Sequence, residues 1–488
     1  MPNQKASATR PVVVNGVATA AAPAEARYTL VEFFAGGGLA RLGFGNAWDV
    51  VLANDMCAKK AKAYRANFGA ADFVGGDVAK LRAADIPFSD VWWASFPCTD
   101  HSTAGLQKGF HGVHGSAVFA LLKRLQALKR VGRAPGVLAF ENVVGFMGGD
   151  GEDFRLLAAQ IATCGYRLGG VVVDAEHWLP QGRRRIFLVA VQADVPLPSG
   201  LALPKADQRW HPPFFRKAVK TWQEQGGEWT WWTLPEPAPR TTTLADIVEP
   251  ADTVEWFGQE AEVRLLALLD EPGRARLAEM RAAGHPVIGT MVERTHPVLG
   301  ERVASIRADT AFTLMATATG TSRQRLIEVN DQDIRVREYT PRELARLMGV
   351  PETYSPPTKL VPAMKVMGDA VAVPAVRHLV CGLIEPLVDA CRASRGNESI
   401  SRPEDGRRSI KDKTVGMLTY LLPGEHLRIK RLAGAQGLSL SRWVLTAINA
   451  ALVNAGEAPL QLYEASPRDG RSKTKGQPAQ KTRLAEAA

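Results

Sequence analysis

Short apolar runs that alternate with helical patterns dominate the chain from residue 28 onward. The runs are YTLVEFFA, DVVLAND, DVWWASF, GVLAFEN, GGVVVDA and RIFLVAV, and stretches such as AKKAKAYRANF and FALLKRLQALKR lie between them. Buried strands that alternate with helices are typical of an α/β fold with a mostly parallel sheet. Ligands of such sheets lie beyond the carboxyl ends of the strands. The residues directly after each run are therefore the candidates for function.

Composition limits the class of protein. The chain has 488 residues, of which 46% are apolar and 23% charged, and this is ordinary for a globular protein of roughly two to three domains. Its five cysteines lack CxxC or Cys/His spacing, which indicates neither a disulfide framework nor a metal site. Because we find no secretion signal and no run of about 18 apolar residues, we expect a cytoplasmic protein without a membrane span. The net charge of +10 favours a polyanionic partner.

The first three runs end in residues that suit an adenosine-type cofactor. Gly36–Gly38 follow the first run, where backbone N–H groups can approach a ligand closely. Asp55 ends the second run, where a carboxylate can bind ribose hydroxyls or cap the next helix. Asp77, in FVGGDV, is a candidate acceptor for an adenine amino group or a turn aspartate. Three such residues at successive strand ends favour the cofactor more than any one of them.

Reactive groups follow the later runs. Cys98 comes after Pro97 at the end of the fourth run, and a lone cysteine is either a small buried residue or a nucleophile. Glu141 ends the fifth run, where a buried carboxylate is costly unless it has a partner. Arg183 and Arg185 alternate with Gln181 in LPQGRRRIFLVAV. One interpretation of an arginine triplet is a solvated or phosphate-binding patch. Because this triplet leads directly into a buried strand, the other interpretation is that its side chains point toward the ligand cleft at the strand ends.

These motifs, in this order, resemble those of the cytosine-C5 DNA methyltransferases over residues 28 to about 390. FFAGGG is similar to the first cofactor motif of that family, FPC to its nucleophile motif, ENV to its catalytic glutamate motif and QGRRR to its Q-x-R-x-R motif. REYTPRELARLMGVPETY and VMGDAVAVPAV resemble the ninth and tenth motifs. The chain departs from the family pattern at Leu39, in TDHS after the cysteine, and at Asp369, where the family usually has asparagine.

The resemblance implies a DNA (cytosine-5)-methyltransferase with S-adenosyl-L-methionine as cofactor, in the setting of a restriction–modification system. Cys98 would attack C6 of a cytosine flipped out of double-stranded DNA, and Glu141 would contact N3. Arg183 or Arg185 would hold the base oxygen and orient the glutamate. The loop at 103–116 would close over the DNA. The implied cofactor-binding residues are Phe34, Gly36, Gly38, Asp55, Asp77 and Pro97. No metal is implied.

The same resemblance divides the chain into segments. We expect a flexible N-terminus at 1–26, and a Rossmann-like catalytic core with helices on both sheet faces at 27–250. A smaller target recognition region is expected at 251–312, and a return to the core at 313–390. The remaining expected segments are a linker at 391–413, a small domain at 414–456 and a disordered basic tail at 457–488.

The domain at 414–456 has the pattern of one strand and two helices, which cannot bury their apolar stripe alone. It resembles ribbon-helix-helix domains, which dimerise and bind DNA. Residues 396–488 carry 15 Lys and Arg against 9 Asp and Glu, 15 − 9 = +6, which favours contact with a nucleic-acid backbone. We expect a homodimer through this module, which either adds DNA affinity or regulates its own promoter; the alternative is a dimerisation domain alone.

Two other functions are compatible with the motifs. One is a tRNA cytosine-5 methyltransferase of the same fold, although the long interval between the Q-x-R-x-R and ninth motifs suits duplex DNA better. The other is a DNA-binding regulator that uses the methylase fold as a scaffold. The presence of Cys98, Glu141 and both arginines favours an enzyme over a scaffold.

Overall fold

The fold is described by a computed structural model of the chain. It describes residues 28–97, 115–148, 151–295, 300–316, 323–330 and 333–395. The expected N-terminal segment, Cys98, nearly all of the expected loop at 103–116 and the ribbon-helix-helix region with its basic tail lie outside these ranges.

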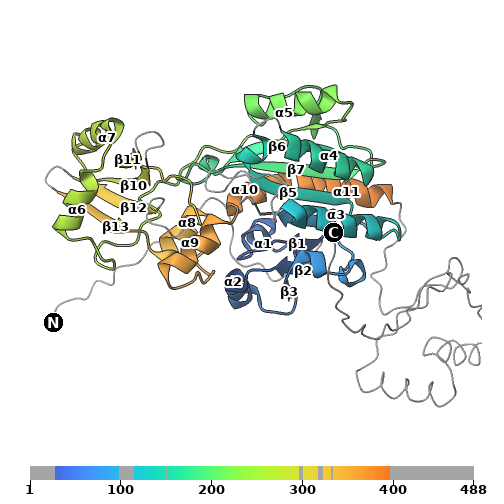
Figure 1. The fold of residues 1–488 in the computed structure, drawn as a ribbon, viewed down its shortest axis with the longest axis horizontal. Coiled ribbons are helices and arrows are strands. Elements are labelled where there is room, and N and C mark those ends of the chain that lie inside the picture. The colour runs from blue at the N-terminus through green and yellow to red at the C-terminus, as the bar shows by residue number, and fades with distance from the viewer. Residues whose placement is uncertain are drawn as a thin grey trace, which may run out of the picture. The chain divides into compact units, whose positions relative to one another are not determined.

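The larger sheet has seven strands and contains every predicted apolar run (Figure 1). Neighbouring strands follow the order β3 (Phe73–Gly75), β2 (Trp48–Asp55), β1 (Tyr28–Phe33), β4 (Val91–Ser95), β5 (Val137–Val143), β7 (Arg184–Gln192) and β6 (Tyr166–Asp174). Strand β7 is antiparallel to both of its neighbours, and the other pairings are parallel. The prediction of a mostly parallel α/β sheet is confirmed.

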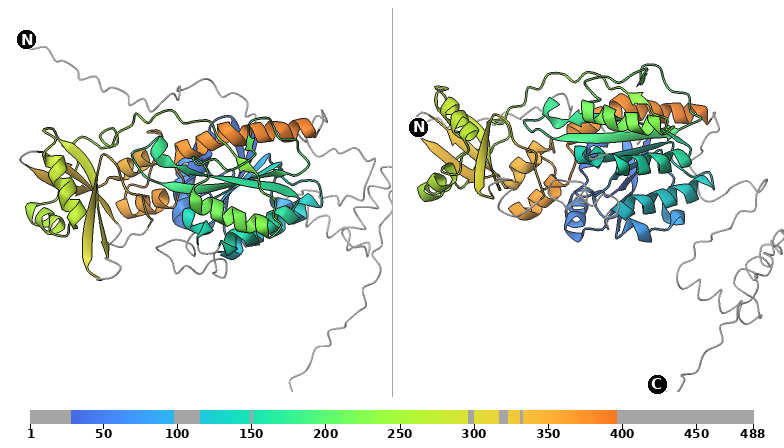
Figure 2. Two further views of the ribbon diagram at one scale, coloured as in Figure 1. Left: turned by 90° about the horizontal axis from the view of Figure 1, so that it is seen from above. Right: turned by 45° about the horizontal axis from the view of Figure 1, so that its top comes forward.

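Helices cover both faces of this sheet, as Figure 2 shows. Successive strand side chains point to opposite faces, so Trp93 packs in one buried cluster and Trp92 in the other. The first cluster includes side chains of α1 (Leu39–Phe44), α2 (Ala58–Phe68), α10 (Val373–Leu379) and α11 (Glu385–Ser394). The second includes side chains of α3 (Gly115–Lys129), α4 (Glu152–Thr163) and α5 (Pro213–Glu224). Burial on both faces explains why the strands are near-continuous apolar runs.

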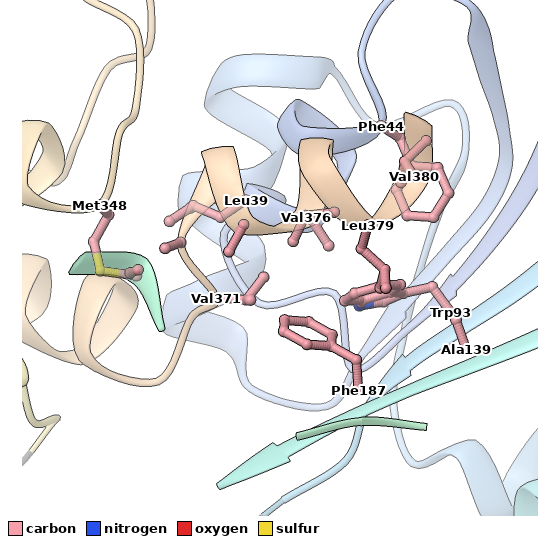
Figure 3. Close-up of a cluster of buried hydrophobic side chains, with 14 of the residues drawn as sticks. Leu39, Phe44, Trp93, Ala139, Phe187, Met348, Val371, Val376, Leu379 and Val380 are labelled. Carbon is pink, nitrogen blue, oxygen red and sulfur yellow. The ribbon is translucent and has the colours of Figure 1, made fainter. Parts of the chain in front are cut away.

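The helical segment Leu360–Ser394 closes the first face. It contains α9 (Leu360–Gly368), α10, a π-helical turn (Val380–Ile384) and α11. Figure 3 shows Val376 and Leu379 of α10 between Leu39 and Phe44 of α1 and the sheet residues Trp93 and Phe187. The segment is long and apolar enough to cross a membrane, but 56% of its most apolar window is buried inside the protein. Its packing is that of a core helix.

A second, smaller sheet follows along the chain. It is antiparallel, in the order β11 (Arg302–Ala308), β10 (Val287–Thr295), β12 (Gln324–Val329) and β13 (Ile334–Glu338). Its own core includes Met291, Ile306 and Ile327, with Leu265 from α6 (Gln259–Leu266) and Met280 from α7 (Glu271–Arg281).

This sheet extends past the boundary that we expected at residue 312. Strand β12 pairs with β10 along its whole length, and β13 pairs with β12, so both belong to the smaller domain. The chain returns to the larger domain with α8 (Pro341–Leu347). The remaining described strands, β8 (Ala202–Leu203) and β9 (Trp231–Trp232), form a two-stranded pair.

Candidate active site

The turn after β1 is tight and conformationally strained. Phe34 has φ 58°, Gly36 φ 59° and Gly38 φ 82°, all in the left-handed region that glycine adopts readily and phenylalanine rarely. A Cβ on Gly37 would lie 2.5 Å from Val366 Cγ1, and one on Gly38 would lie 2.3 Å from Phe68 Cε2. A Cβ on Gly36 would meet nothing closer than Lys60 Cδ at 3.9 Å. The turn is closed by protein at Gly37 and Gly38, and open to a ligand at Gly36.

Asp55 connects the ends of β1 and β2. Its Oδ2 accepts a hydrogen bond from the Gly36 N–H at 2.8 Å, and its Oδ1 accepts one from the Cys57 N–H at 2.7 Å, directly before α2. The side chain is buried. The carboxylate therefore shapes the glycine turn and the segment before α2. The N-cap of α2 is Cys57 and no side chain caps this helix, so Asp55 is not its cap, and the contact to ribose stays a prediction.

Asp77 follows β3 at the same edge of the sheet. Its Oδ1 accepts a hydrogen bond from the Ala79 N–H at 2.9 Å and caps a short 3-10 helix, Val78–Lys80. This is the geometry of a turn aspartate. The contact between Asp77 and adenine stays a prediction.

The end of β4 leads into the expected nucleophile. Phe96 is buried and packs edge-on against Phe146, with ring centroids 5.3 Å apart, and Pro97 is half-buried. Asn142 Nδ2 donates to the Phe96 carbonyl at 3.4 Å. Ser95 lies opposite Glu141 in the β4–β5 register. Glu141 and Asn142 are thus held beside the segment that continues to Cys98.

Glu141 forms an ion pair with Arg185, with 3.1 Å between Oε1 and Nε. In the antiparallel register Val143 lies opposite Arg185, so Glu141 and Arg185 are diagonal neighbours, which lie on the same face of the sheet. Their side chains are 7% and 12% exposed. Both charges are therefore largely removed from water, and each provides the partner that the other needs.

Gln181 and Arg183 are hydrogen-bonded to the backbone of other segments. Arg183 Nη1 donates to the Leu314 carbonyl at 2.9 Å, and Nη2 donates to the carbonyls of Gly368, at 2.8 Å, and Ala370. Gln181 accepts a hydrogen bond from the Leu314 N–H and donates to the Leu347 carbonyl. The three motif residues therefore have different surroundings: Arg185 meets Glu141, while Arg183 and Gln181 join β7 to the segments near 314, 347 and 369.

Sequence reasoning missed three residues around the glycine turn. Tyr354 donates from its hydroxyl to the Gly37 carbonyl at 2.9 Å, and Lys60 lies over Gly36. Glu32, on β1 directly before the turn, is 1% exposed, and its Oε2 has no hydrogen-bond partner among the described residues. Burial raises the pKa of Glu32 to about 8, although Arg41 opposes the rise. A carboxylate inside the apolar run YTLVEFFA is the signal that could have revealed it.

The polar groups at this sheet edge fit an adenosine-type cofactor. An open glycine, two carboxylates at successive strand ends and a half-buried proline face the same edge of a parallel sheet. Within the described residues, the residues implied to bind the cofactor all occupy strand ends or the turn after one.

The comparison with protein-family models identifies the family of the chain. The family model described as C-5 cytosine-specific DNA methylase matches residues 28–385. The type II methyltransferase M.NlaX of Neisseria lactamica is 27% identical over 72% of this chain and 95% of its own length. The type II methyltransferase M.SsoII of Shigella sonnei is 27% identical over 74% of this chain and 81% of its own. The crystal structure of S. pombe Dnmt2 methyltransferase aligns with 74% of this chain and 99% of its own, at 17% identity and a TM-score of 0.43.

Proposed function

The chain belongs to the C-5 cytosine-specific DNA methylase family, and we propose that this DNA (cytosine-5)-methyltransferase acts through Cys98, with Glu141 and Arg185 holding the target cytosine. The observation that carries the proposal is the buried Glu141–Arg185 pair. Glu141 lies opposite Ser95, three residues before the expected nucleophile, and the neighbouring Asn142 donates to the carbonyl of Phe96, two residues before it.

The proposed chemistry begins with covalent activation of the base. C5 of cytosine is a poor nucleophile, so the Cys98 thiolate adds to C6, forming a C–S bond and shifting the electrons of the C5–C6 double bond to C5. S-adenosyl-L-methionine, when bound, supplies the methyl group that C5 takes up. The demethylated cofactor leaves as S-adenosyl-L-homocysteine. A base such as water then takes the C5 proton, and cleavage of the C–S bond restores the aromatic ring and releases the Cys98 thiolate.

Glu141 and Arg185 would stabilise the base while the thiolate adds. A proton shared between the Glu141 carboxyl and N3 offsets the negative charge that develops on the ring, which is general-acid catalysis. Arg185 orients the glutamate through its ion pair with Oε1. Its Nη1 donates to the Arg184 carbonyl, so Nη2 would donate to the base oxygen. We assign Arg183 a positioning role, because its guanidinium is bonded to three backbone carbonyls.

The cofactor would lie along the ends of β3, β2 and β1. Asp77 and Asp55 suit the adenine and ribose, and Phe34, Gly36 and Gly38 suit the remainder of the molecule. Strand β1 lies between β2 and β4 in the sheet. A methyl group carried at the β1 end would therefore be next to the end of β4, where Pro97 lies.

DNA is the substrate of the family, and the target cytosine would be flipped from the duplex into this site. We assign target recognition to the smaller domain, residues 259–338, because it has its own core and sheet. Since curated relatives are type II methyltransferases, we infer a role in a restriction–modification system in the cytoplasm. The dimerisation module expected at 414–456 lies outside the described residues and stays a prediction.

Transfer of a labelled methyl group from S-adenosyl-L-methionine to duplex DNA and to tRNA tests this function. We expect label in DNA and none in tRNA, and bisulfite sequencing of DNA from cells that express the chain should show methylated cytosine within one short recurring sequence. Label in tRNA alone would favour the tRNA methyltransferase, and label in neither would favour a regulator that uses the fold as a scaffold.

A further inference from the structure

An open groove with a basic lining lies on the flank of the larger domain, outside the site described above. It runs between α3 and the segment after β3 that contains two short 3-10 helices, Val78–Lys80 and Ala83–Asp85. The cationic side chains that line it are Lys80, Arg82, Lys123 and Arg124. The other lining residues are leucine and alanine, so no acidic side chain of the described residues lines the groove.

The position of the groove separates it from the residues that we assign to the base and the cofactor. Strands β3 and β4 both belong to the parallel part of the sheet, so the connection between them runs from the carboxyl ends of the strands back to their amino ends. Leu81 and Ala83, in the middle of this connection, pack against the buried cluster that contains Trp92. The groove is therefore on the sheet face that α3 covers, and not at the edge where Asp55 lies.

Arg124 holds the two walls of the groove together. From α3, its Nε donates to the Leu81 carbonyl at 3.0 Å, its Nη1 to the Ala120 carbonyl at 2.9 Å, and its Nη2 to the Ala79 carbonyl. All three acceptors are neutral, and among the described residues Arg124 has no ion pair. Its guanidinium is thus fixed in place, and its positive charge stays at the groove.

Two lysines add exposed charge to opposite walls. Lys80 ends the first 3-10 helix, Lys123 lies on α3, and both residues are exposed. Neither lysine forms a hydrogen bond or an ion pair within the part of the chain that the structure describes. Arg82 makes two hydrogen bonds of 2.6 Å to Asp85, yet its side chain is 78% exposed. Like charges that line one groove repel one another, so the groove favours an anion from outside the described residues.

The lining also determines which chemical groups the groove suits. Ammonium and guanidinium groups are hydrogen-bond donors without acceptors, and phosphate oxygens are strong acceptors with negative charge. No aromatic side chain on which a base could stack, and no Asn or Gln that could read a base edge, is among the lining residues that the structure describes. An open groove of this composition suits a row of phosphate groups and not the bases attached to them.

We propose that this groove binds backbone phosphates of duplex DNA outside the recognition sequence. Lys80 and Lys123 donate to phosphate oxygens from the two walls, and Arg124 supplies fixed positive charge beside them. DNA is the polyanion on which the family acts, and its duplex carries one phosphate per about 1.7 Å of axis, so several cations meet phosphates at once. The inference rests on the proposed function for the identity of the polymer. It adds a contact independent of sequence, which raises the affinity for long DNA while the enzyme searches for its target.

Duplex length separates this contact from the target site. We would compare a short duplex that holds little more than the recognition sequence with a long duplex that extends several helical turns to either side. The dissociation constant of each is measured at several salt concentrations for the full chain and for the groove variant, Lys80→Gln/Lys123→Gln. Lys59→Gln/Lys62→Gln is the matched control, because it removes two exposed lysines of α2 and so changes the net charge equally. Single-turnover methylation of the short duplex reports that each variant is folded and has an intact active site.

We expect the groove variant to bind the long duplex about tenfold more weakly at physiological salt, and the slope of log K against log salt to fall in magnitude by about 2. Its affinity for the short duplex, and the rate at which it methylates that duplex, should stay within about twofold of the unaltered chain. The control variant should bind both duplexes as the unaltered chain does.

Equal losses in the control variant would overturn the inference, because net charge alone would then explain the effect. Unchanged affinity for the long duplex, or an equal loss for the short one, would also overturn it. Inorganic tripolyphosphate tests the other source of phosphate: if the groove variant loses calorimetric binding of this ion but keeps its affinity for the long duplex, the groove belongs to a free polyphosphate and the inference is wrong. Failure of the unaltered chain to bind or methylate either duplex would instead overturn the proposed function itself, and the inference with it.

Discussion

Arg185 meets Glu141 diagonally across two antiparallel strands, with Nε 3.1 Å from Oε1, whereas Arg183, two residues earlier, is bonded to three backbone carbonyls. Two arginines of one motif thus support the site in different ways. One is paired with a side chain that we assign to the chemistry, and the other holds distant segments of the chain together. Substitution of each should therefore have a different signature.

Glu141→Gln should lower the methylation rate by about 10²–10⁴-fold, because the amide cannot supply the proton that N3 needs. Arg185→Ala should also lower the rate, since the glutamate loses the group that orients it. Single-turnover methylation of a duplex with the target cytosine measures both. Because the residues act as a unit, the double variant should be hardly slower than Glu141→Gln alone. Rate losses that multiply in the double variant would contradict the pairing.

Arg183→Ala should act on stability. It leaves three carbonyls without their donor, at about 1–3 kcal/mol for each buried group, so the free energy of unfolding should fall by at least about 3 kcal/mol. Arg184→Ala is the control, because Arg184 is 68% exposed and its pair with Asp174 should be worth less than about 1 kcal/mol. Urea denaturation distinguishes the two variants. An Arg183→Ala protein as stable as the control would refute the positioning role.

Asp55→Ala should weaken cofactor binding by about tenfold or more while the turnover number at saturating cofactor stays nearly constant. Contacts to the ribose, and the shape of the turn at Gly36, contribute equally to the ground and transition states, so they affect binding more than chemistry. Calorimetry and steady-state kinetics give the two quantities. Asp49→Ala, an exposed position at the other end of β2, is the control. Unchanged affinity in the Asp55 variant would restrict its role to the hydrogen bonds with the Gly36 and Cys57 N–H groups.

Glu32 should make the stability of the protein depend on pH. Its pKa is about 8 in the folded protein against an ordinary value of 4.5, so between these pH values the folded state binds one proton more than the unfolded chain. The free energy of unfolding should therefore fall as the pH rises from about 4.5 to about 8, by on the order of 1 kcal/mol per pH unit. Glu32→Gln mimics the protonated form and should lack this slope. Denaturation of both proteins at pH 5.5, 6.5 and 7.5 measures the difference, and parallel pH profiles would contradict it.

The strands of the larger sheet are predictable from the sequence because both of their faces are buried. The central strands alternate their side chains between two apolar cores, as Trp92 and Trp93 do, so their runs are nearly continuous in apolar residues. The positions of Asp55, Asp77 and Glu141 at strand ends follow from the same pattern, since parallel strands bring their carboxyl ends to one edge of the sheet.

The remaining features depend on contacts between residues far apart along the chain. The different roles of Arg183 and Arg185 depend on the carbonyls at 314, 368 and 370, which no local pattern indicates. Strands β12 and β13 lie in the segment 313–390, which we expected to belong to the catalytic core. The pairing of β12 with β10, and of β13 with β12, places both strands in the smaller domain. The partnership of Lys60 with Asp369 joins two helices about 300 residues apart along the chain.

The most direct test of the account is the capture of Cys98 on its substrate. A duplex with 5-fluorocytosine at the target position, incubated with the enzyme and S-adenosyl-L-methionine, should form a complex that survives SDS, because the fluorine on C5 cannot leave as a proton does. Peptide mass spectrometry should place the cross-link on Cys98, and Cys98→Ala should form no complex while it still binds DNA. An active enzyme that forms no adduct, or an adduct at another residue, would contradict covalent catalysis by Cys98.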